Sequence, residues 1–242
     1  ALYRGESVVY TEDRVAYIVL DCLVKKPIPS LDLWSERFNV SRPCIQRDMK
    51  RVKRWLANEH LELASYPGRG YCLESSEYLI RKAIVTWILE QFGSGAIAVI
   101  SQKDSDFYQA ALWQQLFGDV ELGQLVHIFE ELDSRVDLNV QHTRYNMLVL
   151  YAAVTIHRRA TLCVITPDDL PPERELVCSV LILRLSALLE QKMGLRLPAE
   201  ELAALQQYYQ ELSAAQPEKS GESRRLAAVG QSIMEEFAGA VE

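Results

Sequence analysis

The residues best suited to chemistry in this sequence are the positively charged side chains between positions 42 and 54. Six arginines or lysines occur in this stretch, against Asp48 as its one carboxylate. A cationic surface of this kind attracts the phosphates of a nucleic acid. Arginine can also bind guanine, and glutamine can bind adenine, through two hydrogen bonds. The stretch therefore predicts a DNA-contacting surface, with a solvated helix face that has no ligand as the alternative.

The order of these side chains along a helix predicts which part of DNA each would contact. Residues in the first turns of a recognition helix come nearest the base edges, and later residues meet backbone phosphates. The first group is Arg42, Gln46 and Arg47, and the second is Lys50, Arg51 and Arg54. Ser41 precedes them as the expected N-cap, and Pro43 suits the first turn of a helix.

A second feature follows at residues 61–73, where the apolar period changes to that of a strand. Two short runs, 61–65 and 71–73, flank a Pro-Gly-Arg-Gly turn at 67–70. This arrangement predicts a β-hairpin, and a hairpin directly after a recognition helix is typical of a wing. We expect Arg69 at its tip, with Tyr71 beside it, to reach phosphate or the minor groove. A solvated turn residue is the alternative for Arg69.

No other group of residues favours catalysis or metal binding. The sequence has no glycine-rich phosphate loop, no H-E-x-x-H motif and no paired Cys/His cluster. Its four histidines are far apart, and its five cysteines lack the spacing of a zinc site or a disulfide framework. We therefore expect no enzyme activity, no cofactor and no metal.

Helical signals surround the basic stretch. Apolar residues recur every three or four positions from 12 to 23, and Pro27 and Pro29 end that helix. Ser30 offers an N-cap for a short second helix that stops near Asn39. The third helix, from residue 42, buries a stripe against the first two. That stripe is Ile45, Met49, Val52, Trp55 and Leu56.

From residue 75 onward only helical periods are visible. We expect a connecting helix at 75–92 and further helices at 104–116, 123–134, 143–159, 173–192, 198–214 and 223–240, with a linker at 215–222. The predicted domains are 1–74, 75–222 and a helix at 223–242 that leads into a further module. The predicted fold is mainly α, with an N-terminal winged helix-turn-helix of three helices and a β-hairpin, followed by an all-α helical bundle.

Charge is distributed unevenly along the chain. The formal net charge is −7, but residues 1–74 contain twelve positive and ten negative side chains. Any polyanion should therefore bind this first third. No apolar run approaches the ~20 residues that a membrane span needs. We expect a cytoplasmic protein with no membrane partner.

The basic stretch and the hairpin resemble a known family. The segments FNVSRPCIQRDMKRVKRWL and ASYPGRGYCLESSEYLIR are similar to the winged-helix domain of the antiterminator-like activators of sugar phosphotransferase operons, the mannitol-activator and BglG-like group. Members carry a VSR-x-T-I-x-R-D helix, a PG-x-GY-x-L wing and an E-x-x-x-R entry to the next helix. Here Cys44 replaces the threonine, and Glu77 with Arg81 forms the entry. The resemblance spans residues 14–81.

Residues 145–159 and 197–208 are similar to the two signature helices of that family's phosphotransferase-system regulation domain. Each signature helix commonly carries a histidine that accepts phosphate, and Tyr151 and Tyr208 stand at those positions here. We expect no phosphorylation of this module. His157 is a candidate substitute acceptor, although a surface histidine is the better interpretation. The resemblance implies that phosphotransferase proteins act through modules outside residues 1–242.

Three functional hypotheses follow. The first is a transcription regulator, an activator by the resemblance, that binds an operator in double-stranded DNA as a homodimer. The second is an RNA-binding antiterminator or a protein-docking regulator that uses the helical domain. A recognition helix fits the major groove of B-DNA and not the deep, narrow groove of A-form RNA, which favours the first. The third, a helical enzyme with a DNA-binding appendage, lacks a catalytic constellation.

Overall fold

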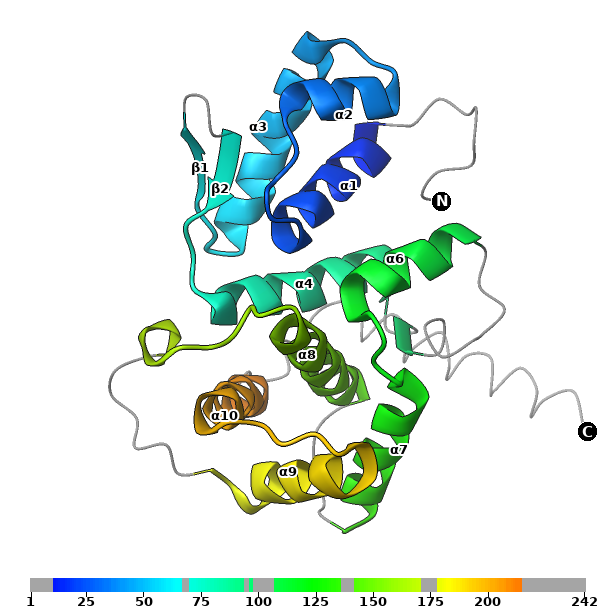
Figure 1. Cartoon of the computed structure of the whole chain (residues 1–242), viewed down its shortest axis with the longest axis vertical. Helices are drawn as coiled ribbons and strands as arrows, with labels where there is room; N and C mark the ends of the chain where they lie inside the picture. The colour runs from blue at the N-terminus through cyan, green and yellow to red at the C-terminus, as the bar shows by residue number, and fades with distance from the viewer. Residues whose placement is uncertain are drawn as a thin grey trace, which may run out of the picture. The chain divides into compact units, whose positions relative to one another are not determined.

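The computed structural model describes residues 11–66, 70–93, 96–97, 107–135, 142–170 and 178–214. In this part the protein is mainly helical, with one sheet of two strands (Figure 1). The chain divides into two compact units, residues 1–207 and residues 208–242. The mainly helical fold predicted from the sequence is confirmed at this level.

Helices α1 (Thr11–Val24), α2 (Leu31–Phe38) and α3 (Arg42–Asn58) form where the sequence predicts them. The Ser30 side chain caps α2 by accepting a 3.3 Å hydrogen bond from the Leu33 amide. Asn39 ends α2 in the left-handed conformation, with φ at 49°. Ser41 occupies the N-cap position of α3, but its side chain makes no capping hydrogen bond. The expected capping role of that side chain is therefore wrong, although its carbonyl accepts the first amides of α3.

These three helices share one core. Ile18, Trp34 and Ile45 are fully buried, one from each helix. The apolar stripe predicted for α3 is buried at four of its five positions, and Trp55 is half-buried. Because this apolar face of α3 is buried in the core, the opposite face of the helix is exposed to solvent.

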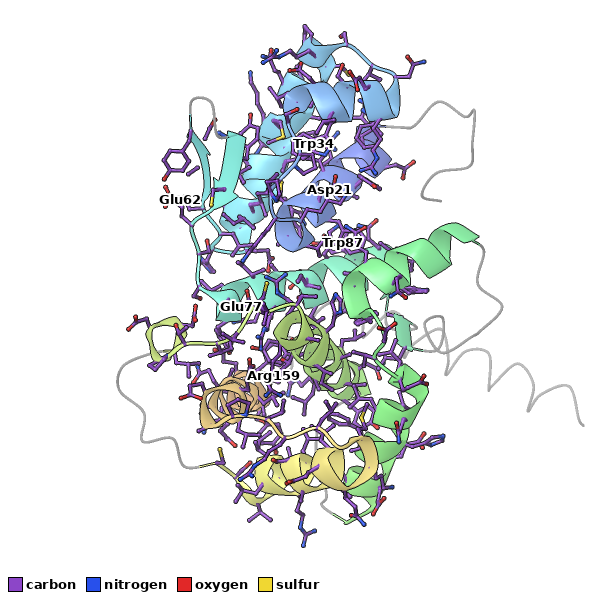
Figure 2. All side chains as sticks on the ribbon, in the orientation of Figure 1. Asp21, Trp34, Glu62, Glu77, Trp87 and Arg159 are labelled. Carbon is purple, nitrogen blue, oxygen red and sulfur yellow. The ribbon has the colours of Figure 1, made fainter. Side chains whose placement is uncertain are left out.

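Two buried carboxylates join the helices by polar contacts. Asp48 of α3 accepts a 2.9 Å hydrogen bond from Nε of Arg14, and both side chains are buried. Asp21 of α1 accepts a 2.9 Å hydrogen bond from the indole of Trp34 (Figure 2). Buried polar groups need such partners, so these contacts fix how α2 and α3 lie against α1.

A β-hairpin follows α3, as predicted. Strands β1 (Leu63–Tyr66) and β2 (Gly70–Leu73) pair antiparallel, with Leu63 opposite Leu73 and Tyr66 opposite Gly70. The Glu62 amide donates a 3.0 Å hydrogen bond to the Ser75 side chain, which closes the open end of the hairpin. Arg69 and the rest of the turn at 67–69 lie outside the described residues.

The remaining helices agree with the predicted series except at one start. Their bounds are α4 (Glu77–Phe92), α6 (Phe107–Phe117), α7 (Leu122–Arg135), α8 (His142–Ala160), α9 (Val180–Met193) and α10 (Ala199–Ala214). Of the helix expected at 173–192, residues 173–177 lie outside the described residues, and α9 begins at Val180, because Ser179 is extended and its side chain caps the Ile182 amide. The linker predicted at 215–222 and the helix predicted at 223–240 fall outside the described residues.

Within the described ranges, none of the helices has the length and apolar character required to cross a membrane.

Candidate nucleic-acid interface

The polar side chains of α3 lie on one exposed face of the helix. An α-helix turns by about 100° per residue, so four of these side chains fall within an arc of about 100°. We call these four, Gln46, Arg47, Lys50 and Arg54, the central strip. Arg42 and Arg51 lie at opposite edges of the same face, about 180° apart. All six side chains are exposed, so the structure presents them together as the sequence suggests.

The two edge arginines are paired with carboxylates from the neighbouring helices. Arg42 lies 3.1 Å from a carboxylate oxygen of Asp32 on α2. Arg51 lies 3.2 Å from the carboxylate of Glu12 on α1. The expectation that Asp48 alone opposes these cations is therefore wrong. Asp48 is turned into the core, and the opposing carboxylates come from elements that sequence periodicity on α3 cannot identify.

Glu12 is ionised more readily than an ordinary glutamate. A hydrogen bond from its own backbone amide lowers the pKa of Glu12, and the Arg51 guanidinium lowers it further. The negative charge opposite Arg51 is thus present throughout the neutral range.

The central strip carries the unpaired charge. Among the described residues, Arg47, Lys50 and Arg54 form no ion pair, and Gln46 forms no side-chain hydrogen bond within the chain. Three solvated cations and an amide on one face can bind phosphate and base edges without first breaking an internal contact.

The hairpin is attached to α3 through an aromatic contact. The Lys53 ammonium lies 5.9 Å from the ring centroid of Tyr71, a cation–π contact, and the Tyr71 ring centroid is 6.3 Å from that of Trp34. Burial raises the pKa of the Tyr71 hydroxyl. The Tyr71 ring therefore holds the hairpin against the core. The sequence predicted a DNA contact for Tyr71 but did not predict this structural role.

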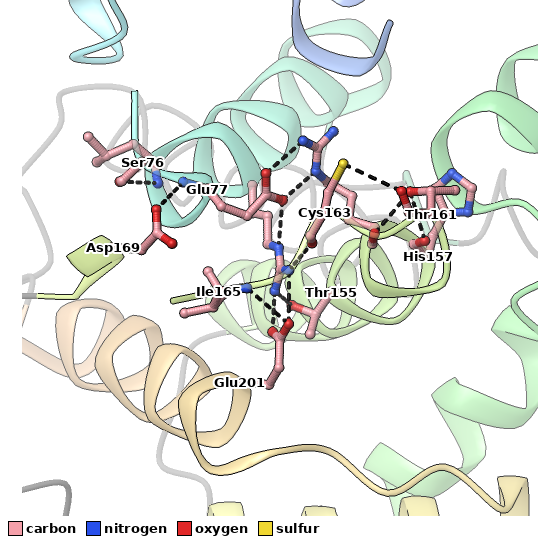
Figure 3. Close-up of polar contacts among 12 residues, drawn as sticks. Ser76, Glu77, Thr155, His157, Thr161, Cys163, Ile165, Asp169 and Glu201 are labelled. Carbon is pink, nitrogen blue, oxygen red and sulfur yellow. Dashed lines mark hydrogen bonds and ion pairs between the residues drawn. The ribbon is translucent and has the colours of Figure 1, made fainter. Parts of the chain in front are cut away.

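A buried cluster of charges joins helices α4, α8 and α10 (Figure 3). Glu77 and Arg81 of α4, Arg158 of α8 and Glu201 of α10 are each less than a tenth exposed. Arg81 donates to Glu77 at 3.0 Å and to Glu201, and Arg158 donates to Glu77 at 2.5 and 2.7 Å. We call these four residues the buried charge cluster. Its two positive and two negative charges offset one another, as buried ions require.

The buried charge cluster also reaches α1. Nη1 of Arg158 donates a 3.0 Å hydrogen bond to the carbonyl of Leu23, in the last turn of α1. Carbonyls at a helix end have no partner inside the helix, and a cation there also suits the helix dipole. The guanidinium of Arg158 therefore caps the C-terminal end of α1, although the two residues are far apart in the sequence.

Helix α4 makes two further contacts with the first three helices. The Trp87 indole donates a 3.0 Å hydrogen bond to the Ala16 carbonyl of α1 (Figure 2). The Trp55 indole of α3 donates a 2.7 Å hydrogen bond to Glu90 of α4. Helix α4 thus contacts α3, which carries the central strip, and also supplies Glu77 and Arg81 to the buried charge cluster.

The sequence motif identified only half of this cluster. The E-x-x-x-R spacing singles out Glu77 and Arg81, and the structure pairs them. Arg158 and Glu201 had no comparable signal, because one belongs to an arginine pair at a helix end and the other to a pair of adjacent glutamates. Their burial depends on how α8 and α10 pack onto α4, which local pattern does not encode.

Tyr151 and Tyr208, which the sequence resemblance aligns with histidines, are buried. Tyr151 is 0% exposed and Tyr208 is 3% exposed. The Tyr151 ring packs edge-on against Tyr78, with centroids 6.1 Å apart. Both tyrosine side chains are therefore part of the core.

His157 is half-buried and not a fully exposed surface residue as interpreted from the sequence. A Cβ placed on Gly118, where φ is +54°, would lie 2.5 Å from Nδ1 of His157. Burial lowers the pKa of His157, and the Arg158 guanidinium lowers it further. The imidazole is therefore neutral at physiological pH and packs on the turn between α6 and α7.

The part of the chain that the structure describes contains no group of three or more histidine, cysteine or acidic side chains placed to hold a metal ion. No model of a known protein family matches the chain, and no curated protein matches it.

Proposed function

We propose that this protein is a DNA-binding transcription regulator that contacts duplex DNA through the exposed face of α3. The observation that supports this proposal most directly is the central strip. Its three cations have no internal partner among the described residues, and its amide, Gln46, lies at one end of the same strip. Unpaired cations bind phosphate at low cost, and arginine and glutamine can distinguish bases.

The surrounding elements suit such a role. A short helix, a tight turn at 39–41 and a longer helix precede an antiparallel hairpin, and this order is that of a winged helix-turn-helix. In this proposal the helix α3 enters the major groove and the hairpin lies against the backbone beside it. The helices from α4 onward form the attached bundle that receives a signal.

The sequence resemblance adds the biological setting. We propose that the regulated genes form a carbohydrate phosphotransferase operon and that the protein binds its operator as a homodimer, with an activating role. Two-fold symmetric dimers match the repeated half-sites of such operators. The buried tyrosines at positions 151 and 208 are consistent with control by phosphotransferase proteins through other modules.

A binding comparison tests this proposal. Fluorescence anisotropy of the whole chain with duplex DNA and with structured RNA should show preference for the duplex, and genome-wide footprinting should identify the operator. A preference for structured RNA would favour the antiterminator alternative and contradict the proposal.

Arg47→Ala separates base reading from phosphate contact. We expect a loss of about 1–3 kcal/mol on the operator, or roughly 5- to 150-fold in affinity, because one two-bond contact to a base disappears. The loss on scrambled duplex should be smaller. An equal loss on both duplexes would make Arg47 a phosphate contact only.

A further inference from the structure

The edge arginines of α3 differ from the central strip in one respect that bears on DNA selection. Each has a carboxylate partner supplied by another helix, Asp32 for Arg42 and Glu12 for Arg51. The two helices that supply them, α1 and α2, pack directly against α3 (Figure 1). The exposed face is therefore bordered by negative charge on both sides.

We infer that Asp32 and Glu12 restrict DNA contact to the central strip and thereby reduce binding to non-specific sequence. This inference rests on the proposed function. Non-specific binding draws essentially all its affinity from phosphate contacts. Two arginines held by carboxylates cannot add such contacts unless the pairs break, and the carboxylates themselves repel phosphate.

These ion pairs should reduce the affinity for a specific DNA site less than the affinity for non-specific DNA. Two of the three side chains expected to read base edges, Gln46 and Arg47, belong to the central strip and carry no internal contact. The two carboxylates thus act as specificity-determining residues, because they oppose non-specific binding, which depends on phosphate contacts alone. Both pairs are well exposed, with Asp32 at 62% and Glu12 at 73%, so amide substitutions there replace no core contact.

Asp32→Asn tests the inference through Arg42. The probe is a random-sequence duplex, and affinity is measured by fluorescence anisotropy over a series of salt concentrations. Releasing one arginine should add one phosphate contact, so the slope of log K against log salt should steepen by about 0.9. Affinity at 0.1 M salt should rise about five- to tenfold. Affinity for the operator should rise by a smaller factor, so that the specificity ratio falls.

A double-mutant cycle distinguishes the ion pair from a general charge effect. In an Arg42→Gln background, Asp32→Asn should produce no more gain than Glu190→Gln, an exposed control on α9 that changes the net charge equally. Glu12→Gln should behave in the same way with Arg51→Gln. Thermal melting of every variant checks that the fold is retained.

The outcomes separate this inference from the proposed function. Wild-type binding that Arg47→Ala weakens, together with no gain from Asp32→Asn or Glu12→Gln, overturns the inference alone. An equal gain in the Arg42→Gln background also overturns it. If neither the wild type nor the two amide variants bind duplex, both the inference and the proposed function are wrong.

Discussion

Arg158→Met should destabilise the protein strongly, because it removes half of the positive charge in the buried charge cluster. The substitution deletes both hydrogen bonds to Glu77, at 2.5 and 2.7 Å, and the 3.0 Å bond to the Leu23 carbonyl. Glu77 would keep a 3.0 Å bond from Arg81 as its remaining side-chain partner in the cluster. Removing one partner of a buried ion pair typically costs about 3–5 kcal/mol.

The expected change in melting temperature follows from the size of the protein. At about 2–4 °C per kcal/mol for a chain of this length, the loss corresponds to roughly 6–20 °C. Circular dichroism during thermal and urea unfolding of the whole chain measures both quantities. Methionine approximates the length of the arginine stem, so the variant tests the charge and hydrogen bonds more than the packing.

The adjacent residue provides a matched control. Arg159 precedes a turn, is half-buried, and makes a 2.8 Å hydrogen bond to the Arg196 carbonyl at the surface (Figure 2). Arg159→Met should cost about 1 kcal/mol or less, since an exposed contact is largely replaced by water. Equal losses at positions 158 and 159 would refute the claim that the buried charge cluster holds the helices together. A Glu77→Gln/Arg158→Met double variant should lose less than the sum of the two single variants.

Three further predictions concern the helical part of the chain. Because the pKa of His157 lies below its ordinary value of 6.5, the unfolded chain binds a proton more readily, and stability should fall as pH drops below that value. Melting temperatures over this pH range should show a smaller fall in His157→Gln, and an unchanged fall would contradict the lowered pKa. Gly118→Ala should lower the melting temperature, because its Cβ would meet the imidazole and its φ of +54° disfavours a side chain; no change would indicate that this turn relaxes. Incubation with phosphotransferase phosphodonors should leave the chain unlabelled, and a phosphohistidine found by mass spectrometry would overturn the assignment of Tyr151 and Tyr208.

Local chemistry explains why the first three helices were predictable. Pro27 and Pro29 end the first helix, Ser30 caps the second and Pro43 lies in the first turn of the third, so each boundary has its own signal. The start of α9 was predicted wrongly. Residues 173–178 contain three charged side chains followed by Leu176, Val177 and Cys178, and the capping signal that marks the start is Ser179.

The contacts of the candidate site were less predictable than its residues. Periodicity placed Arg42 and Arg51 on the exposed face, but their pairing with Asp32 and Glu12 depends on how α1 and α2 pack against α3. Tyr71 illustrates the same limit of local pattern. Its position beside the turn predicts a DNA contact, which stays a prediction, and gives no sign that its ring also packs on Trp34.

The hydrogen bonds that α1 and α3 make with later helices determine how the chain can be shortened for experiments. A fragment that ends at residue 74 would lose the Trp87 donor to Ala16, the Arg158 donor to Leu23 and the Glu90 acceptor for Trp55. Extending the fragment through α4 would restore the first and third of these contacts but not the second. Deletion mapping of DNA binding in this protein should therefore compare fragments that end after α4 with fragments that retain α8, so that a loss of α1 stability is not mistaken for a loss of a binding residue.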